Sequence, residues 1–329
     1  MQLVGTEPQR RHWIRDASAI GEARRDAQNL AAKLGLAETP AGRVGVVVTE
    51  LATNLLRHAH GGELLLQSVP AEGGPAIEVI ALDRGPGMAD TAACLRDGYS
   101  SAGTAGTGLG AVKRLSADFD MYSVVGRGTA VMARVGEAQT CRFGAICTAV
   151  EGETECGDAW RLAQRNHEAA LVVIDGLGHG GQAAAASARA AEVFTQAPFD
   201  APRLLIERMH QALNGMRGAA AACAFVNERQ AVAYAGVGNI CGHLLSAGKS
   251  RGLVSHSGTL GFKAGRVQQF DYSSEGSIML IMHSDGLSGR WDLDDHPGLR
   301  QRHPAVIAAV LYREHGRVRD DATVVVIGS

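Results

Sequence analysis

The sequence has almost no excess charge of either sign, with 32 lysine and arginine residues against 34 aspartate and glutamate residues. This balance excludes the broad positive field with which many proteins hold nucleic acid or anionic lipid. Long apolar runs are also missing, because the longest fall well short of the roughly 20 residues that a membrane-spanning helix needs. We therefore expect partners other than nucleic acid or a membrane.

The six cysteines include no Cys-x-x-Cys pair, and no secretory leader is visible. Both absences favour reduced thiols in a cytoplasmic protein. The composition, 46% hydrophobic and 20% charged, is that of an ordinary globular protein. A single hydrophobic core seldom grows past about 250–300 residues, so the length of the chain predicts two domains.

Glycine, by contrast, is abundant and clustered, with 42 residues in the chain. Residues 103–110 read "GTAGTGLG" and precede a helical segment, an arrangement that favours phosphate because backbone N–H groups can approach it closely. No strand leads into these glycines, which excludes a Rossmann fingerprint. "GHLLSAGKS" has one residue too many between its glycines for a Walker A loop.

Hydrophobic periodicity predicts helices over residues 16–34, from Pro40 to residue 59, and over 109–117, with strands at 63–69, 76–83, 121–125 and 129–135. Residues 136–140 are a predicted linker. Many strands follow, with helices near 181–195, 202–216 and 304–314, which predicts two sheets with helices packed outside. The expected fold class is α+β, with one domain over 1–136 and another over 137–329.

Glu50 and Asn54 are four residues apart and share one face of the second predicted helix. That spacing also fits a solvated polar face. Asp83 ends an apolar strand and could accept a hydrogen bond from an amino group, or could be a simple turn aspartate.

Taken in order, "TELATNLLRHA", "LDRGPGM", "GTGLG" and "GRGTAV" resemble the four boxes of the GHKL family of ATP-binding proteins. The likeness covers roughly residues 15–135 and is greatest to the anti-sigma and switch serine kinases of bacterial stress signalling. It implies a GHKL (Bergerat) α/β sandwich that binds ATP and Mg²⁺. The histidine-kinase branch is not expected, because the first box begins at residue 49 and His12 has no heptad pattern around it.

The resemblance implies a role for each matching residue. Glu50 would be the general base that takes a proton from a serine or threonine hydroxyl, and Asn54 would coordinate Mg²⁺. Asp83 would bind the adenine amino group. The other implied nucleotide-binding residues are Gly85 and Gly87 near the base, Gly106, Thr107, Gly108, Leu109 and Gly110 around the phosphates, and Thr129 on the adenine side.

Acidic residues stand out again after residue 140, at Asp158, Asp175, Asp285 and the pair Asp320 and Asp321. Most lie at the edge of strongly apolar strands, where collecting carboxylates is costly unless cations neutralise them. Oxygen-only ligands suit Mg²⁺ or Mn²⁺ better than zinc. Each residue taken alone also fits an ordinary turn after a strand.

The ordered set "GDAW", "VIDGLGHG", "GVGN", "HSDGL" and "DDATVVV" resembles the SpoIIE branch of the metal-dependent type 2C protein phosphatases. It implies an α-β-β-α sandwich with two Mn²⁺ or Mg²⁺ ions and direct attack of an activated water on phosphorus. Asp175 would bridge the metals, Asp158 and the Gly176 carbonyl would serve one, and Asp285 and Asp320 the other. Asp321 is an alternative to Asp320, and His179 is either an acid or a loop histidine.

Together these features predict a bifunctional partner-switching regulator of bacterial stress or sigma-factor signalling. The first domain would phosphorylate serine or threonine on a STAS-type antagonist protein, and the second would hydrolyse the phosphate from the same or a related protein. An ATP-binding regulatory or anti-sigma module without kinase activity, fused to an active phosphatase, is the alternative. A sigma factor or a downstream phosphatase is a further candidate partner, and an oligomer is compatible with the sequence.

Overall fold

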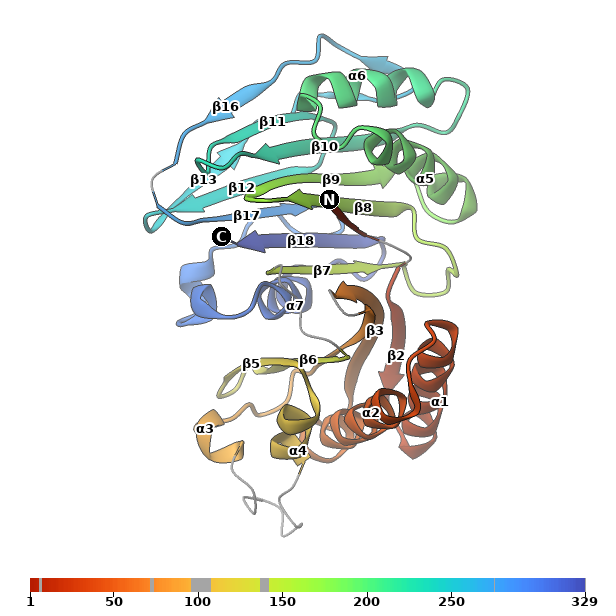
Figure 1. The fold of residues 1–329 in the computed structure, drawn as a ribbon, viewed down its shortest axis with the longest axis vertical. Coiled ribbons are helices and arrows are strands. Elements are labelled where there is room, and N and C mark those ends of the chain that lie inside the picture. The colour runs from red at the N-terminus through yellow and green to blue at the C-terminus, as the bar shows by residue number, and fades with distance from the viewer. Residues whose placement is uncertain (6–7, 72–73, 96–107, 137–141, 275, 329) are drawn as a thin grey trace. The chain divides into compact units, whose positions relative to one another are not determined.

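The computed structural model describes residues 1–5, 8–71, 74–95, 108–136, 142–274 and 276–328 (Figure 1). The chain divides into two compact units, and both are discontinuous in sequence. The first unit combines residues 1–8, 142–295 and 314–329, and the second combines residues 9–141 and 296–313. The domain limits at 136 and 137 remain a prediction. Relative to these limits, residues 1–8 lie in the compact unit of the C-terminal part, and residues 296–313 lie in that of the N-terminal part.

The second unit is built on one antiparallel sheet with the strand order β2-β3-β4-β6-β5. Its strands are β2 (Arg10–Ile14), β3 (Gly62–Ala71), β4 (Gly74–Leu82), β5 (Asp118–Val124) and β6 (Gly128–Val135). Its helices are α1 (Ala17–Lys33), α2 (Glu38–Ala59), α3 (Thr91–Cys94), α4 (Gly108–Leu115) and α7 (Pro304–His315).

Helices α1, α2 and α4 cover one face of this sheet, because their apolar stripes share one core with alternate residues of the strands. Leu51 and Val47 of α2, for example, pack in the same cluster as Leu66 of β3. The Asp16 side chain caps α1 by accepting the Ser18 and Ala19 N–H groups. The helices and strands predicted for residues 16–135 are confirmed, with ends shifted by a few residues.

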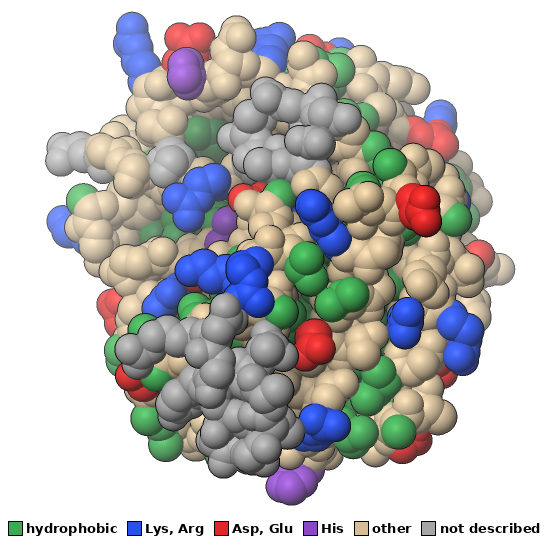
Figure 2. Space-filling model, turned by 60° about the horizontal axis from the view of Figure 1, so that its bottom comes forward, with side chains coloured by type: hydrophobic (Ala, Val, Ile, Leu, Met, Phe, Trp, Pro, Cys, Tyr) green, Lys and Arg blue, Asp and Glu red, His purple; other side chains and the backbone are tan. Residues whose placement is uncertain are grey.

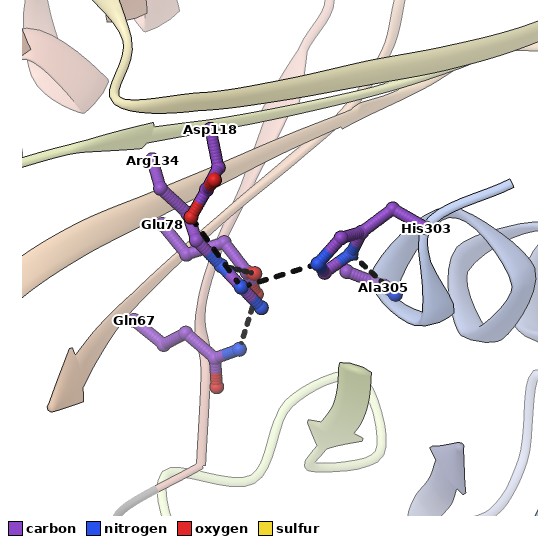
Figure 3. A network of polar contacts seen from close by, with 6 residues as sticks. All are labelled: Gln67, Glu78, Asp118, Arg134, His303 and Ala305. Carbon is purple, nitrogen blue, oxygen red and sulfur yellow. Dashed lines mark hydrogen bonds and ion pairs between the residues drawn. The ribbon is translucent and has the colours of Figure 1, made fainter. Parts of the chain in front are cut away.

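The opposite face of the sheet carries buried polar residues and meets helix α7. Glu78 and Arg134 are paired across β4 and β6, with 2.7 Å between Arg134 Nε and Glu78 Oε2, and both side chains are fully buried. Gln67 donates to Glu78 from β3, and Arg134 Nη1 lies 3.3 Å from His303 Nε2 at the start of α7 (Figure 3). A buried ion pair repays its desolvation cost only with good geometry and further hydrogen bonds, and Gln67 and His303 each add a polar contact to one member of the pair.

Helix α7 is apolar around its whole circumference, since every residue from Pro304 to Leu311 is buried. A helix of that kind is buried on all sides, unlike an amphipathic surface helix. The predicted helix over 304–314 is therefore confirmed. Its place in the same compact unit as residues 9–141 was not anticipated.

The first unit contains two antiparallel sheets. One has the order β1-β8-β9-β10-β11-β16 and the other β13-β12-β17-β18-β7. The strands of the first sheet are β1 (Gln2–Val4), β8 (Asp158–Arg165), β9 (Glu168–Gly176), β10 (Ala219–Val226), β11 (Val232–Val237) and β16 (Phe270–Tyr272). Those of the second are β7 (Phe143–Thr148), β12 (Cys241–Ser246), β13 (Lys249–Leu253), β17 (Ile278–His283) and β18 (Ala322–Gly328).

Helices α5 (Gly181–Gln196) and α6 (Pro202–Ala212) cover the first of these sheets, and the two sheets contact each other between β18 and β8. The alanine-rich face of α5 lies against β8 and β9, where small side chains allow close approach. A short hairpin, β14 (Gly258–Thr259) and β15 (Lys263–Ala264), and two 3₁₀ turns, η1 (Leu293–Asp295) and η2 (Leu299–Gln301), complete the described elements. The two sheets with helices outside, predicted for the second half, are confirmed.

Basic and acidic side chains are interspersed on the face seen in Figure 2. All five cysteines within the described ranges are free thiols. None of the helices described in the structure combines the length and the apolar character needed to cross a bilayer.

Candidate nucleotide and metal sites

The predicted kinase residues Glu50 and Asn54 lie beneath the first turn of α4. A methyl group on Gly108 would sit 3.3 Å from Glu50 Oε2 and 3.6 Å from both Asn54 side-chain atoms Oδ1 and Nδ2. Both side chains are half-buried, which differs from a freely solvated polar face. Helix α2 therefore presents a carboxylate and an amide side by side at a helix N-terminus, where phosphate is favoured.

Asp83 follows β4 and is held by two backbone amides of the second unit. Its Oδ1 accepts from Gly85 N at 2.8 Å and from Thr129 N at 3.1 Å. Burial raises the pKa of Asp83, against the opposing effect of these amides and of the Arg313 charge. The Gly85 contact is the Asx-turn bond of a turn aspartate, and neither contact uses Oδ2, so the geometry fits a turn role and also an acceptor for a ligand N–H group.

Of the other predicted nucleotide residues, those that the structure describes lie in the turn after β4, in α4 and in β6. Gly85 packs so closely on Ala59 that a methyl group would lie 2.7 Å from its Cβ, and Gly87 has a φ of +68°. Leu109 and Gly110 belong to the first turn of α4, and the Thr129 hydroxyl lies 2.9 Å from Ser123 Oγ. Gly106 and Thr107 lie outside the described residues.

Two glycines of the β5–β6 turn offer a matched test of this site. Gly126 and Gly128 both have a φ of +78°, so alanine at either position costs roughly 1–2 kcal/mol of backbone strain. Only at Gly128 would the methyl group collide, at 2.1 Å from the Asp83 carbonyl oxygen, whereas nothing lies within 4 Å at Gly126. We expect G128A to weaken ATP binding at least about tenfold and G126A to leave it near wild type, as measured by calorimetric titration. Equal ATP affinity in the two variants would show that Asp83 does not contribute to nucleotide binding.

In the first unit, the chain topology brings the four predicted carboxylates to one end of the two sheets. Asp158 and Asp175 face each other as paired residues of β8 and β9. Asp285 follows β17 and Asp320 precedes β18, and these strands are antiparallel neighbours. The Ser284 hydroxyl donates to Asp158 Oδ2 at 2.6 Å, which links the two sheets at this end.

The carboxylates are close enough to disfavour one another's charge. Burial, and then the charge of Asp175, raise the pKa of Asp158 well above its usual value. Burial and the neighbouring Asp285 raise the pKa of Asp175 to about 7. Burial and Asp285 also raise the pKa of Asp320. A divalent cation would offset this repulsion, so the all-oxygen donor set fits Mg²⁺ or Mn²⁺.

Asp320 and Asp321 have different surroundings. The Asp321 carboxylate is buried and accepts the Val150 and Gly157 N–H groups at 2.7 and 2.6 Å. Asp320 is half-exposed and lies near Asp285. These contacts give Asp321 a structural role and favour Asp320 as the ligand.

Asn239 was missed as a site residue, although it ends the noted "GVGN" segment. Its Nδ2 donates to Asp175 Oδ2 at 3.1 Å and to Asp285 Oδ2 at 2.7 Å. Within the described part of the chain, no three acidic, histidine or cysteine side chains converge as a complete metal-binding group. The side-chain amide of Asn239 therefore bridges two of the candidate metal ligands, Asp175 and Asp285.

Converting Asn239 to aspartate adds a carboxylate at this point. Without metal, we expect N239D to lower the melting temperature by roughly 2–4 °C, which corresponds to about 1 kcal/mol. Saturating Mn²⁺ should then raise the melting temperature of N239D more than that of the wild type. Differential scanning fluorimetry in EDTA and in Mn²⁺ measures both values, with the exposed N214D as control. An EDTA melting temperature equal to that of wild type would contradict the crowding of negative charge.

Two further predicted residues flank this end of β9. Gly176 N donates to Gly157 O at 3.0 Å, and a methyl group at Gly176 would lie 2.4 Å from Ala183 O. The glycine therefore lets α5 pack against the strand end beside Asp175. His179 is largely exposed, and its Nδ1 lies 2.7 Å from Glu153 Oε1.

Sequence comparison matches the two parts of the chain to two known families. The profile of the histidine kinase-like ATPase domain matches residues 15–135, and that of stage II sporulation protein E (SpoIIE) matches residues 165–328. The serine/threonine-protein kinase RsbT of Bacillus subtilis (strain 168) is 36% identical over 114 residues, 35% of this chain and 86% of RsbT. The chain therefore belongs to the histidine kinase-like ATPases in its N-terminal part.

The C-terminal part matches a second curated protein. The phosphoserine phosphatase RsbX of the same organism is 31% identical over 140 residues, 42% of this chain and 70% of RsbX. The C-terminal part belongs to the SpoIIE phosphatases. The chain is thus a fusion of an RsbT-like and an RsbX-like domain, and both family resemblances are confirmed.

A solved structure is also similar to part of this chain. A chain reported for the bacterial stressosome, described as a modular system adapted to control secondary messenger signaling, is 28% identical to this chain with a TM-score of 0.53. The match covers 58% of this chain and all of that one. The predicted α+β fold class, with an RsbT-like and an RsbX-like domain, is confirmed.

Proposed function

We propose that this chain is a bifunctional partner-switching regulator, with a serine/threonine kinase in its RsbT-like part and a phosphatase in its RsbX-like part. The proposed substrates are STAS-type antagonist proteins of bacterial stress signalling. Similarity to RsbT and RsbX over most of their lengths supports this proposal. The observation that carries it is the pairing of Glu50 and Asn54 beneath α4 in one unit, with aspartates at one end of the two sheets in the other that raise one another's pKa.

In the kinase part, Asp83 would hold the adenine amino group and Asn54 would hold Mg²⁺. Glu50 would accept the proton of the substrate serine or threonine hydroxyl as that oxygen attacks the γ-phosphorus of ATP. The N-terminal turn of α4 would face the transferred phosphoryl group, whose negative charge a helix N-terminus favours. Bound Mg²⁺ would supply charge neutralisation at the phosphates.

In the phosphatase part, Asp158, Asp175, Asp285, Asp320 and the Gly176 carbonyl would hold two Mn²⁺ or Mg²⁺ ions. When bound, these ions would supply the nucleophile and the positive charge that phosphate-ester hydrolysis requires. Ser284 would keep Asp158 oriented through its 2.6 Å hydrogen bond, and Asn239 would align Asp175 with Asp285.

Incubation of the chain with ATP, Mg²⁺ and a STAS protein from the same bacterium tests the kinase half. Mass spectrometry should find phosphoserine or phosphothreonine on the STAS protein, and adding Mn²⁺ after ATP is removed should reverse the modification. ATP binding without phosphoryl transfer would identify the RsbT-like part as a regulatory binding module. Retention of phosphate after Mn²⁺ addition would exclude the phosphatase half of the proposal for that substrate.

A further inference from the structure

Helix α7 belongs to the compact unit of the RsbT-like sheet, although the residues before 296 and after 313 belong to the other unit. Its two ends are anchored to different parts of that sheet. At the N-terminal end, His303 N donates to Asp120 Oδ2 at 2.6 Å, and Arg302 lies 3.3 Å from Asp120 Oδ1. The buried Arg134 contacts the His303 ring from β6 (Figure 3).

At its C-terminal end, α7 reaches the predicted adenine residue. Arg313 Nη1 donates to the Asp83 carbonyl oxygen at 3.1 Å, and Arg84 Nη2 donates to the Arg313 carbonyl oxygen. Tyr312 donates to Glu63 Oε1 at 2.8 Å. Arg313 is only 6% exposed, so its charge acts on Asp83 with little screening by water. The backbone of Asp83 is thus held by a residue 230 positions away in the sequence.

The chain that follows α7 leads directly to the phosphatase ligands. Ser288 N donates to His315 O at 2.9 Å, and Arg317 N donates to Gly286 O at 2.7 Å. Leu287 and Gly316 form a β-bridge beside these bonds. These contacts hold the loop that begins at Asp285, and Asp320 follows three residues after Arg317.

We propose that Arg313 is a positioning residue for Asp83, and that α7 couples nucleotide binding at Asp83 to divalent-metal binding at Asp285 and Asp320. The inference rests on the proposed function, because it requires both ligands to bind. Two residues separate Arg313 from Gly316, so a displacement of the helix end moves the Asp83 contact and the Asp285 loop together. Nucleotide binding favours the arrangement in which Asp83 is ordered, and metal binding favours the arrangement in which Asp285 and Asp320 are ordered.

Such coupling is reciprocal, since each ligand must change the affinity of the other by the same factor. We expect ADP to shift the Mn²⁺ concentration for half-maximal hydrolysis of para-nitrophenyl phosphate by at least about fivefold. Mn²⁺ should change the dissociation constant of ADP by an equal factor. Both titrations use the full chain, with free Mn²⁺ buffered so that chelation by ADP does not contribute.

The variant R313M should reduce to near one the factors by which ADP and Mn²⁺ change each other's binding. It should also lower the preference for ADP over IDP, which lacks the adenine amino group. R313K, which keeps a donor and a charge, should restore part of both, and the exposed R319M should behave as wild type. A purely structural loss in R313M would weaken ADP and IDP equally, which would overturn the positioning role.

The wild-type titrations decide the coupling without any variant. A wild-type chain that binds ADP and hydrolyses the ester, but shows no mutual shift, would overturn this inference while leaving the proposed function intact. A wild-type chain that binds no ADP would overturn the proposed function of the RsbT-like part, and the coupling with it.

Discussion

Replacing Asp175 by asparagine is expected to lower Mn²⁺-dependent hydrolysis of para-nitrophenyl phosphate by at least about 10²-fold, the scale on which removing one electrostatic stabiliser slows an enzyme. Asp175 pairs with Asp158 across β8 and β9 and is hydrogen-bonded with Asp285 through Asn239. Removing its charge relieves the repulsion among these carboxylates. D175N should therefore be at least as stable as the wild type in EDTA, although it loses activity.

The exposed D271N, on edge strand β16, controls for the loss of an aspartate charge in the same unit and should keep wild-type activity. Activity is measured over a Mn²⁺ titration, with a melting curve for each variant. Hydrolysis by D175N at the wild-type rate, or hydrolysis by the wild type that survives a chelator, would rule out the metal site built from these residues.

Replacing Glu50 by glutamine is expected to reduce phosphoryl transfer to a STAS partner by about 10²–10⁴-fold, the usual contribution of a general base. ATP binding should remain within a few-fold of wild type, because Asp83 and Asn54 are unchanged. This difference arises because a base acts on the attacking hydroxyl and makes little contribution to holding the nucleotide. Transfer is followed with radiolabelled ATP, and binding by calorimetry.

Glu38, exposed in the first turn of the same helix, provides the matched control, and E38Q should transfer phosphate normally. Transfer by E50Q at the wild-type rate would assign the base to another residue. A wild type that binds ATP without transferring phosphate would identify the RsbT-like part as a binding module.

The sequence predicted most of the fold because local signals agree with tertiary packing. The Asp16 cap and the apolar stripe of α1 define that helix from neighbouring residues alone. The Glu50–Asn54 spacing placed both on one face of α2, and the mostly apolar run "TAVMARV" marked β6 beside its turn glycines. The resemblance to both families was visible in the sequence because each of their motifs is a continuous stretch of residues.

Long-range contacts were beyond such signals. Nothing around Arg313 indicates that its guanidinium reaches Asp83, and the apolar sequence of α7 is equally compatible with burial in either unit. The role of Asn239 depends on β9 and β17, strands of two different sheets, ending close together, which only the tertiary structure reveals. The distinction between Asp320 and Asp321 likewise required the partners of Asp321, which are more than 160 residues away.

The late position of α7 in the chain has a consequence for biosynthesis. A ribosome releases residues 9–141 long before it releases residues 296–313, so the nascent sheet must wait with Arg134, Glu78 and Glu63 uncovered. The RsbT-like half can complete its packing only after nearly all of the RsbX-like half has emerged. Translation itself therefore delays the completed packing of the RsbT-like sheet until the RsbX-like part is almost entirely synthesised.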